Sequence, residues 1–161
     1  MKYGIYYAYW EKEWNGDYKY YIDKISKLGF DILEISCGAF SDYYTKDQEL
    51  IDIGKYAKEK GVTLTAGYGP HFNESLSSSE PNTQKQAISF WKETLRKLKL
   101  MDIHIVGGAL YGYWPVDYSK PFDKKRDLEN SIKNMKIISQ YAEEYDIMMG
   151  WKFLTVLKAI C

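Results

Sequence analysis

The sequence predicts an α/β fold around a parallel sheet, with four strand–helix units followed by the start of a fifth strand. Short, almost continuously apolar runs alternate with longer runs whose apolar residues recur at helical spacing. This repetition implies parallel strands joined by right-handed crossovers. Two architectures fit the pattern: an open doubly wound sheet and the first half of an eight-fold barrel. No linker interrupts the run, so we expect one domain, complete or incomplete.

Five apolar runs are expected to form the strands. The first, "YGIYYAYW", is rich in aromatic residues, and the second, "FDILEIS", contains one carboxylate among aliphatic side chains. The third, "VTLTAGYG", and the fourth, "DIHIVGGAL", carry glycines near their ends, and "DIMMG" opens the fifth. The expected strands cover residues 3–10, 30–36, 62–69, 102–110 and 146–150.

Four amphipathic runs are expected to form the helices. Asp17 lies near the N-cap of the first and Gly29 ends it, Gly61 stops the second, and Pro81 suits the first turn of the third. The residues expected to face the sheet are Tyr18, Tyr21, Ile22, Ile25 and Leu28; Leu50, Ile53, Gly54 and Ala57; Ala87, Phe90, Trp91, Leu95 and Leu98; and Leu128, Ile132, Met135, Ile138 and Ala142.

The composition limits the classes of binding partner and the cellular compartment that we expect for this protein. Lys plus Arg balance Asp plus Glu at 22 each, so no basic field attracts nucleic acid or an anionic membrane. We find neither a signal peptide nor an apolar stretch long enough to span a bilayer. Cys37 and Cys161 are too few and too separated for a disulfide framework or a zinc site. We therefore expect a cytoplasmic protein with no nucleic-acid or membrane partner.

Glycines and aromatic residues gather where the strands end, which is where both architectures bind ligands. The first strand ends in "YYAYW", the third in "GYGP", and the fourth leads into "GGALYGYWP". Such glycines let a ligand approach the backbone closely, while aromatic side chains form the walls of a pocket. Glycines that serve only in turns and aromatic residues that serve only in packing would produce the same sequence pattern. Neither glycine segment has the spacing or the lysine of a phosphate-binding loop, so a nucleotide cofactor is not expected.

Few side chains offer acid–base or metal chemistry. We expect His71 to be solvated or structural and His104 to be a hydrogen-bonded core residue of the fourth strand. Glu34 must face a polar interior or a site, because unpaired burial of a carboxylate is costly, and a supporting role is expected. Cys37 is expected to be a small buried hydrophobe. The two histidines form no ligand pair, so metal binding within the chain has weak support.

Four segments carry a resemblance to a known family. They are "GIYYAYWEKEW", "YKYYIDKISKLGFDILEIS", "NESLSSSEP" and "IVGGALYGYWPVDYSK". In these segments the sequence resembles the ketose 3-epimerases, the group of D-tagatose 3-epimerase and D-psicose (D-allulose) 3-epimerase, over residues 1–150. That group belongs to the xylose isomerase-like TIM barrels. The resemblance therefore implies the first half of a (β/α)₈ barrel.

The resemblance also implies a chemistry, C3 epimerisation of free ketohexoses such as D-fructose, D-psicose and D-tagatose. In the family a divalent ion, usually manganese with cobalt or magnesium as alternatives, chelates the sugar O2 and O3 and acidifies the C3–H bond. Two glutamates on opposite faces of the sugar invert C3 through an enediolate. One Asp and one His complete the metal shell. These groups sit on strands five to eight, and the family forms homo-oligomers.

Five positions of this chain match the family's sugar pocket. The resemblance implies that Tyr6, Gly67, Ala109 and Trp114 line the pocket around the C4–C6 end of the sugar, with Trp14 a weaker candidate. These residues give shape and apolar contact and do no proton chemistry.

The tail after Gly150 departs from the family. The family's fifth strand reads approximately G-M-E-V-L-N-R-F-E, whereas this chain continues "WKFLTVLKAIC". Trp151 is encoded by TGG and Lys152 by AAR. When these bases are regrouped by one position, they read NTG, which encodes Met if N is A, and then GAA, which encodes Glu. The following shifted codons permit the family residues in order. We therefore expect residues 151–161 to be an out-of-frame tail after the loss of one nucleotide, in the genome or in its sequencing.

The sequence thus predicts a truncated ketose 3-epimerase, with residues 1–150 as the N-terminal half of the barrel. Lys152 stands where the family has its first catalytic glutamate, so we expect no catalytic residue, no bound metal and no activity in this chain. The alternative is a catalytically inactive half-barrel that acts as a sugar-binding or self-associating module, because open strand edges and apolar faces favour association. An open flavodoxin-like domain is disfavoured, since no loop cradles a phosphate.

Overall fold

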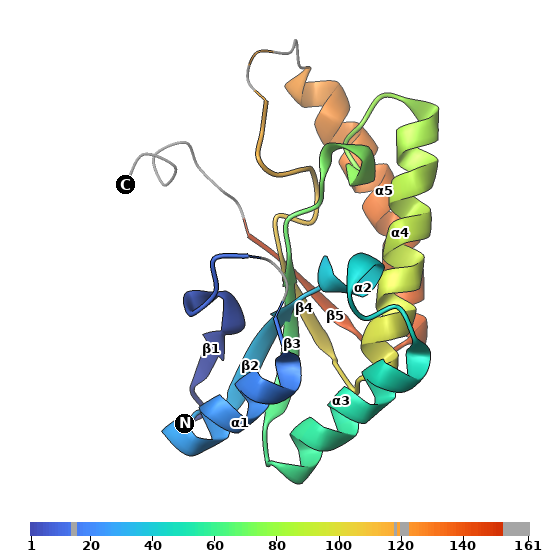
Figure 1. The fold of residues 1–161 in the computed structure, drawn as a ribbon. Coiled ribbons are helices and arrows are strands. Elements are labelled where there is room, and N and C mark those ends of the chain that lie inside the picture. The colour runs from blue at the N-terminus through green and yellow to red at the C-terminus, as the bar shows by residue number, and fades with distance from the viewer. Residues whose placement is uncertain (14–15, 118, 120–122, 153–161) are drawn as a thin grey trace.

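The computed structural model describes residues 1–13, 16–117, 119 and 123–152. These residues form one parallel sheet in the order β1-β2-β3-β4-β5, so each strand pairs with the one before it in the chain (Figure 1). A doubly wound sheet reverses its strand order, so the consecutive order excludes that architecture. The strands are β1 Gly4–Tyr6, β2 Ile32–Ser36, β3 Thr63–Tyr68, β4 Ile105–Gly108 and β5 Met148–Trp151.

Helices connect the strands, and their ends follow the capping residues. The Asp17 carboxylate accepts a hydrogen bond from the Tyr20 N–H at 3.2 Å, and Gly29 ends the first helix with a φ of 81°. Among the described residues, no helix has the length and apolarity needed to cross a bilayer. The helices are α1 Tyr18–Leu28, α2 Ala39–Asp42, α3 Asp47–Glu59, α4 Pro81–Leu100 and α5 Lys124–Glu144, with short 3-10 turns at η1 Tyr7–Tyr9 and η2 Phe72–Glu74.

The hydrophobic core lies between the helices and one face of the sheet. Successive side chains of a strand point to opposite faces, so alternate strand residues enter this core. The strand residues there include Leu33, Ile35, Leu64, Ala66 and Val106, all exposed by 5% or less. Trp91 of α4 and Ile22 of α1 are fully buried against them from the helix side.

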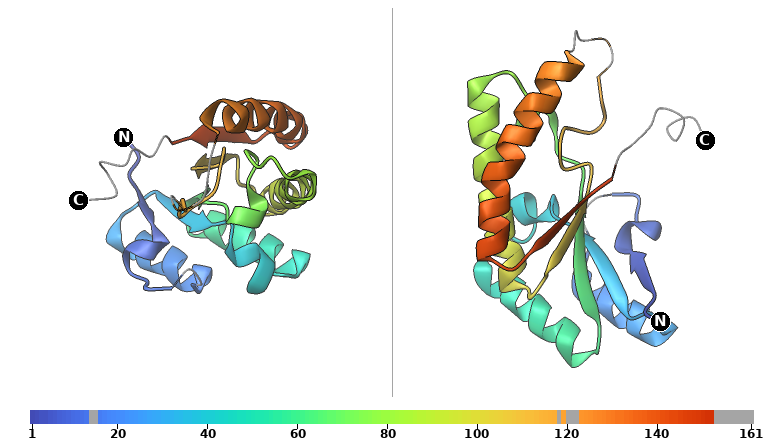
Figure 2. Two further views of the ribbon diagram at one scale, coloured as in Figure 1. Left: turned by 90° about the horizontal axis from the view of Figure 1, so that it is seen from above. Right: turned by 180° about the vertical axis from the view of Figure 1, so that it is seen from behind.

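The opposite face of the sheet, here called the inner face, has no helix over it in the described part of the chain (Figure 2). Ile105 and Met148 lie on it, aligned with each other on β4 and β5, and they are 49% and 70% exposed. Seen from above, the helices form an outer arc around the strands (Figure 2). This is the arrangement of the first half of a (β/α)₈ barrel, whose interior corresponds to the inner face, and it confirms the predicted fold class.

The apolar stripe expected on α5 was partly wrong. Leu128 and Ile132 were expected to face the sheet, yet their side chains are exposed by 60% and 49%. Ser131 and Asn134 are buried in their place, because their side chains bond to backbone carbonyls of loops that pack under the helix. The helical pattern of apolar letters could not reveal a buried stripe that is partly polar. Leu28, at the end of α1, is also exposed, by 58%.

The expected core position of His104 was wrong, although its hydrogen bonding is confirmed. The residue precedes β4, and its side chain is 44% exposed. One ring nitrogen lies 2.8 Å from the Asp146 carbonyl oxygen, and the other lies 3.1 Å from Asp102 Oδ1. Asp102 and Asp146 follow α4 and α5 with positive φ angles of 60° and 57°. His104 therefore joins the turn before β4 to the turn before β5.

Candidate functional site

Two rows of residues cross the inner face towards the carboxyl ends of the strands. In the first row, Glu34 of β2 is in register with Tyr6 of β1 and with Thr65 of β3. The second row lies nearer the strand ends and consists of Ser36, Gly67, Gly107 and Gly150. A polar row thus lies beside a row that carries almost no side chains.

The glycine row, defined as Gly67, Gly107 and Gly150, leaves accessible backbone on the inner face at Gly107 and Gly150, whereas Gly67 is buried. Among the described residues, a Cβ atom on Gly107 would have only the Gly150 carbonyl oxygen within 4 Å, at 3.6 Å. A Cβ atom on Gly150 would meet, in the same part of the chain, only the Val106 carbonyl oxygen, at 4.0 Å. Both positions have room for a side chain and lack one, so a ligand can approach the backbone closely there.

The Glu34 side chain covers the remaining member of the glycine row. A Cβ atom on Gly67 would lie 2.7 Å from Glu34 Oε1, so the carboxylate occupies the space that Gly67 leaves free. Burial raises the pKa of the half-buried Glu34 carboxyl, and the ammonium group of Lys152 opposes that rise. Glu34 faces the inner side of the sheet, as the sequence predicts for a carboxylate that needs polar surroundings.

A cluster of tyrosines fixes the carboxyl ends of β1 and β2. The Tyr18 hydroxyl donates to the Ser36 carbonyl oxygen at 3.0 Å and accepts from the Ser36 N–H at 3.3 Å. Tyr44 stacks on Tyr18 with 4.8 Å between ring centroids, and Tyr7 meets Tyr18 edge to face at 5.3 Å. Burial raises the pKa of the Tyr6, Tyr7 and Tyr18 phenols, which are therefore neutral. The strand ends are held by a rigid, uncharged cluster.

Two loops border the same end of the sheet, residues 69–80 after β3 and residues 109–117 after β4. The Trp114 N–H donates to the Pro70 carbonyl oxygen at 2.7 Å. A Cβ atom on Gly69 would lie 3.3 Å from Trp114 Cβ, so a glycine here permits the close approach of the loops. The Trp114 side chain remains 41% exposed.

The structure brings some of the predicted site residues together. Tyr6 and Gly67 both adjoin Glu34, through the strand register and through the carboxylate that lies over Gly67. Trp114 lies over Gly69, just beyond the end of β3, whereas Ala109 follows β4 directly and is only 9% exposed. Trp14 lies outside the described residues. Their contact with a sugar stays a prediction.

His71, Glu74 and Cys37 lie near the same end of the sheet. His71 is exposed, and its backbone N–H donates to the Glu74 carboxylate at 2.8 Å. The same carboxylate accepts from the Tyr68 hydroxyl at 2.6 Å. Cys37 is fully buried, as expected, and burial raises the pKa of its thiol. In the part of the chain that the structure describes, no three His, Cys, Asp or Glu residues gather closely enough to hold a metal ion.

Comparison with known families agrees with this architecture. Residues 22–151 match the xylose isomerase-like TIM barrel family. The chain belongs to this family. Within it, the chain is similar to the D-psicose 3-epimerase of Enterocloster bolteae, with 54% identity over 154 residues that cover 96% of this chain and 51% of the relative.

Solved structures give the same result for the half-barrel. The D-psicose 3-epimerase from Clostridium cellulolyticum H10, crystallised with D-tagatose, has a TM-score of 0.89 and 46% identity, covering 92% of this chain and 51% of that one. A D-psicose 3-epimerase crystallised in the presence of D-fructose has a TM-score of 0.92 and 40% identity, covering 97% of this chain and 53% of that one. The chain thus spans about half the length of these relatives.

Sequence reasoning missed part of the candidate site. Gly107 was noted only as one of several glycines at the strand ends. Gly150 was noted as the last residue of the fifth apolar run, before the sequence departs from the family, and not as a site residue. Their alignment with Gly67 depends on strand register, which the sequence does not state. Three buried or half-buried amides under the loops, Gln84, Asn130 and Asn134, were also missed, because polar letters on a helix are usually read as a solvent-facing surface.

Proposed function

We propose that this chain is the N-terminal half of a ketose 3-epimerase barrel and supplies the part of the sugar site that binds and orients the substrate. The observation that carries the proposal is the glycine row, which lies beside Tyr6 and Glu34 on the inner face, at the end of the barrel where TIM-barrel enzymes place their sites. The identity to D-psicose 3-epimerase supports it, 54% over 154 residues. The proposed substrates are free ketohexoses of the D-fructose, D-psicose and D-tagatose type.

The proposed substrate-binding residues act by shape and apolar contact. Gly67 adds no side chain to the pocket wall and leaves room for the Glu34 carboxylate. Tyr6 presents a neutral phenol, and Trp114 offers a half-exposed aromatic face on the loop beyond β3. Aromatic faces pack well against the C–H surfaces of a sugar. Ala109 and Trp14 belong to the same proposed group by position. All of them would contact the distal C4–C6 end of the ketose.

The divalent metal that the resemblance implies does not fit the described residues. Lys152 places an ammonium group where the family has a carboxylate, and this cation lies close enough to affect the ionisation of Glu34. A metal ion and an ammonium group repel each other at one site. We derive no catalytic step for this chain, and the 161-residue chain on its own is proposed to be inactive.

The reading frame after Gly150 is part of the proposal. Trp151 and Lys152 are described, and residues 153–161 lie outside the described residues. The shifted codons of Trp151 and Lys152 support a lost base that converts the expected glutamate into lysine. Resequencing the gene across the Gly150 codon is the test. An intact frame that continues into the family motif would mean that the glutamate is present after all, whereas a confirmed single-base loss supports the out-of-frame tail.

The function test measures sugar binding and turnover separately. Purified chain incubated with manganese and D-fructose should yield no D-psicose, while calorimetric titration with D-fructose should show weak saturable binding. Trp114→Ala should weaken that binding by about five- to tenfold, since a tenfold change corresponds to about 1.4 kcal/mol of lost contact. The matched control Tyr3→Ala removes an aromatic ring, 60% exposed, before the start of β1 and should leave binding unchanged.

Two outcomes would contradict the proposal. Metal-dependent D-psicose production by the chain would refute its inactivity, and equal sugar binding by the Trp114 variant and its control would refute the assigned pocket.

A second candidate function is a self-associating module without catalysis. The uncovered inner face favours it, because Ile105 and Met148 expose apolar surface beside each other. Under this alternative the partner is a second copy of the chain. A cytoplasmic location is part of both proposals and is supported by the low cysteine content, with Cys37 buried and free.

A further inference from the structure

Two side-chain amides of α5 bond to the loop that follows β3. Asn134 Nδ2 donates to the Leu76 carbonyl oxygen at 2.8 Å. Asn130 Nδ2 donates to the carbonyl oxygens of Ser77 and Ser78 at 3.3 and 3.1 Å. Three successive carbonyls of the loop thus accept hydrogen bonds from one helix face. The two asparagines can do this together because residues four apart lie on the same side of a helix.

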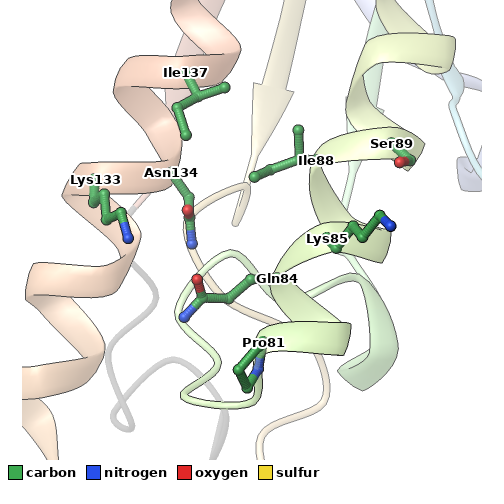
Figure 3. Close-up of a pocket in the computed structure, with 8 residues that line it drawn as sticks. All are labelled: Pro81, Gln84, Lys85, Ile88, Ser89, Lys133, Asn134 and Ile137. Carbon is green, nitrogen blue, oxygen red and sulfur yellow. The ribbon is translucent and has the colours of Figure 1, made fainter.

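Gln84 bonds to the same loop from α4. Its Nε2 donates to the Ser78 carbonyl oxygen at 2.7 Å, so this carbonyl is held from both helices. Figure 3 shows Gln84 and Asn134 on opposite sides of a groove of about 300 Å³ between α4 and α5. Gln84, Asn130 and Asn134 are here called the amide clamp. None of the three carries a charge, so salt does not screen their bonds.

Burial makes the amide clamp difficult to replace by water. Asn134 is 1% exposed, and Leu76, whose carbonyl it binds, is fully buried. A buried carbonyl that loses its donor cannot recover the bond from solvent, which makes its loss costly. An apolar residue would normally occupy such a position on the core face of a helix. The amide therefore has a role in the loop rather than in packing alone.

The clamped loop is joined to the next loop. The Ser131 hydroxyl donates to the Tyr111 carbonyl oxygen at 2.8 Å, so α5 also holds the loop after β4. The Trp114 N–H donates to the Pro70 carbonyl oxygen, which links the two loops directly. Trp114 therefore belongs to a pair of linked loops that α4 and α5 hold through hydrogen bonds.

We propose that the amide clamp positions these two loops so that Trp114 is held in place for a ketose, which makes Gln84, Asn130 and Asn134 positioning residues of the site. The sugar in this statement rests on the proposed function. The proposal that the amide clamp holds Trp114 in place through the loops does not depend on the proposed function.

The test compares local order with global stability in the 161-residue chain. Gln84→Ala and Gln84→Glu both remove the amide donor, and Gln84→Glu keeps nearly the same shape. Amide hydrogen exchange at residues 75–80 and 109–117 should become about tenfold faster in both variants, the effect of one lost hydrogen bond with a net worth near the upper end of the usual range. Exchange in the strands should not change. The control Gln140→Ala removes an exposed amide from α5 and should change neither region.

A spectroscopic signature reports on Trp114 itself. The chain is labelled with 5-fluorotryptophan, and the Trp114 fluorine resonance is assigned by its absence in Trp114→Phe. This resonance should shift or broaden in Gln84→Ala and in Asn134→Ala, and it should be unchanged in Gln140→Ala. Should Asn134→Ala fail to fold, the Gln84 variants decide, because Gln84 is only partly buried.

The outcomes separate this proposal from the proposed function. Uniformly faster exchange throughout the chain, or an unchanged Trp114 resonance in the Gln84 variants, would overturn the clamp. A wild-type Trp114 resonance that does not respond to added D-fructose would instead count against the sugar site and leave the exchange result intact.

Discussion

At the scale of single residues, Gly108 shows how closely β3 and β4 approach at their ends. Its φ of 131° lies in a region that residues with a side chain rarely adopt, and a Cβ atom there would overlap the Tyr68 carbonyl oxygen. Gly108→Ala should therefore lower the free energy of unfolding by about 3 kcal/mol, from backbone strain and overlap together. Urea unfolding measures this change.

The neighbouring Gly107 provides the control for that substitution. A Cβ atom on Gly107 would lie 3.6 Å from the Gly150 carbonyl oxygen, which is an ordinary contact. Gly107→Ala should change the free energy of unfolding by less than about 1 kcal/mol. Equal losses of unfolding free energy in the two variants would show that the backbone strain and overlap at Gly108 are not the cause of the destabilisation.

Glu34 should make the stability of the chain depend on pH. Burial raises the pKa of its carboxyl from the ordinary value of 4.5, with Lys152 opposing the shift. The folded chain then holds this proton more tightly than the unfolded chain. The resulting stabilisation is fully present below pH 4.5 and is lost as the pH rises through the raised pKa.

Glu34→Gln removes this titration, so the variant should gain stability relative to the parent chain as the pH rises from 4.5 through the raised pKa. Urea unfolding at a series of pH values measures the difference. A Glu34→Gln curve that is parallel to that of the parent would contradict the assigned pKa shift.

At the scale of the elements, the start of α5 depends on one side chain. Asp123 Oδ1 accepts from the backbone N–H groups of Lys125 and Arg126, each at 3.1 Å. Asp123→Ala should lower the free energy of unfolding by about 1 kcal/mol, the usual effect of losing an N-cap. Asp123→Asn keeps the accepting oxygen and should retain most of that stability in thermal unfolding. Equal losses would show that the cap contributes little.

The elements that the sequence predicts best are those with a long or strongly apolar pattern. The second and third strands and the long helices are confirmed, because apolar runs and helical spacing reflect burial. The fourth strand covers only Ile105–Gly108 of the expected 102–110. The first strand is shorter than the expected 3–10, since its ladder pairs only Gly4–Tyr6 with β2 and the chain then turns at Tyr7–Tyr9. The four residues of α2, Ala39–Asp42, are too few to produce a helical period.

The candidate site was less accessible to sequence reasoning than the fold. Tyr6, Gly67 and Trp114 could be chosen from residue type and resemblance, because aromatic residues and glycines at strand ends are visible in the letters. The glycine row and the amide clamp depend on register and on which helix face is buried. Asn134 looks like a surface residue in the sequence, and only the loop beneath it explains its burial.

At the scale of the whole molecule, the inner face should cause the chain to self-associate when it is expressed alone. Met148 is 70% exposed on that face and belongs to β5, the last strand of the described sheet. Sedimentation velocity should show concentration-dependent association. Met148→Lys should weaken it by at least about tenfold, because burying such a side chain contributes about 1.5–3 kcal/mol.

Leu128→Lys is the matched control for this prediction. It places the same charge on an exposed apolar position, 60% accessible, on the outer helix α5. Association should be unchanged in this variant. A monomeric parent chain at all concentrations, or equal effects of the two lysines, would show that the inner face does not drive association.

The order of the strands has a consequence for the way the chain folds as it is made. Each strand pairs with the one synthesised just before it, so no strand has to wait for a distant partner. The sequence separation of paired strand residues is therefore limited, from 28 between Gly4 and Ile32 to 43 between Ile105 and Met148. During translation, β1 to β4 with their helices can therefore assemble on the ribosome before β5 has emerged, and β5 then adds to an existing edge.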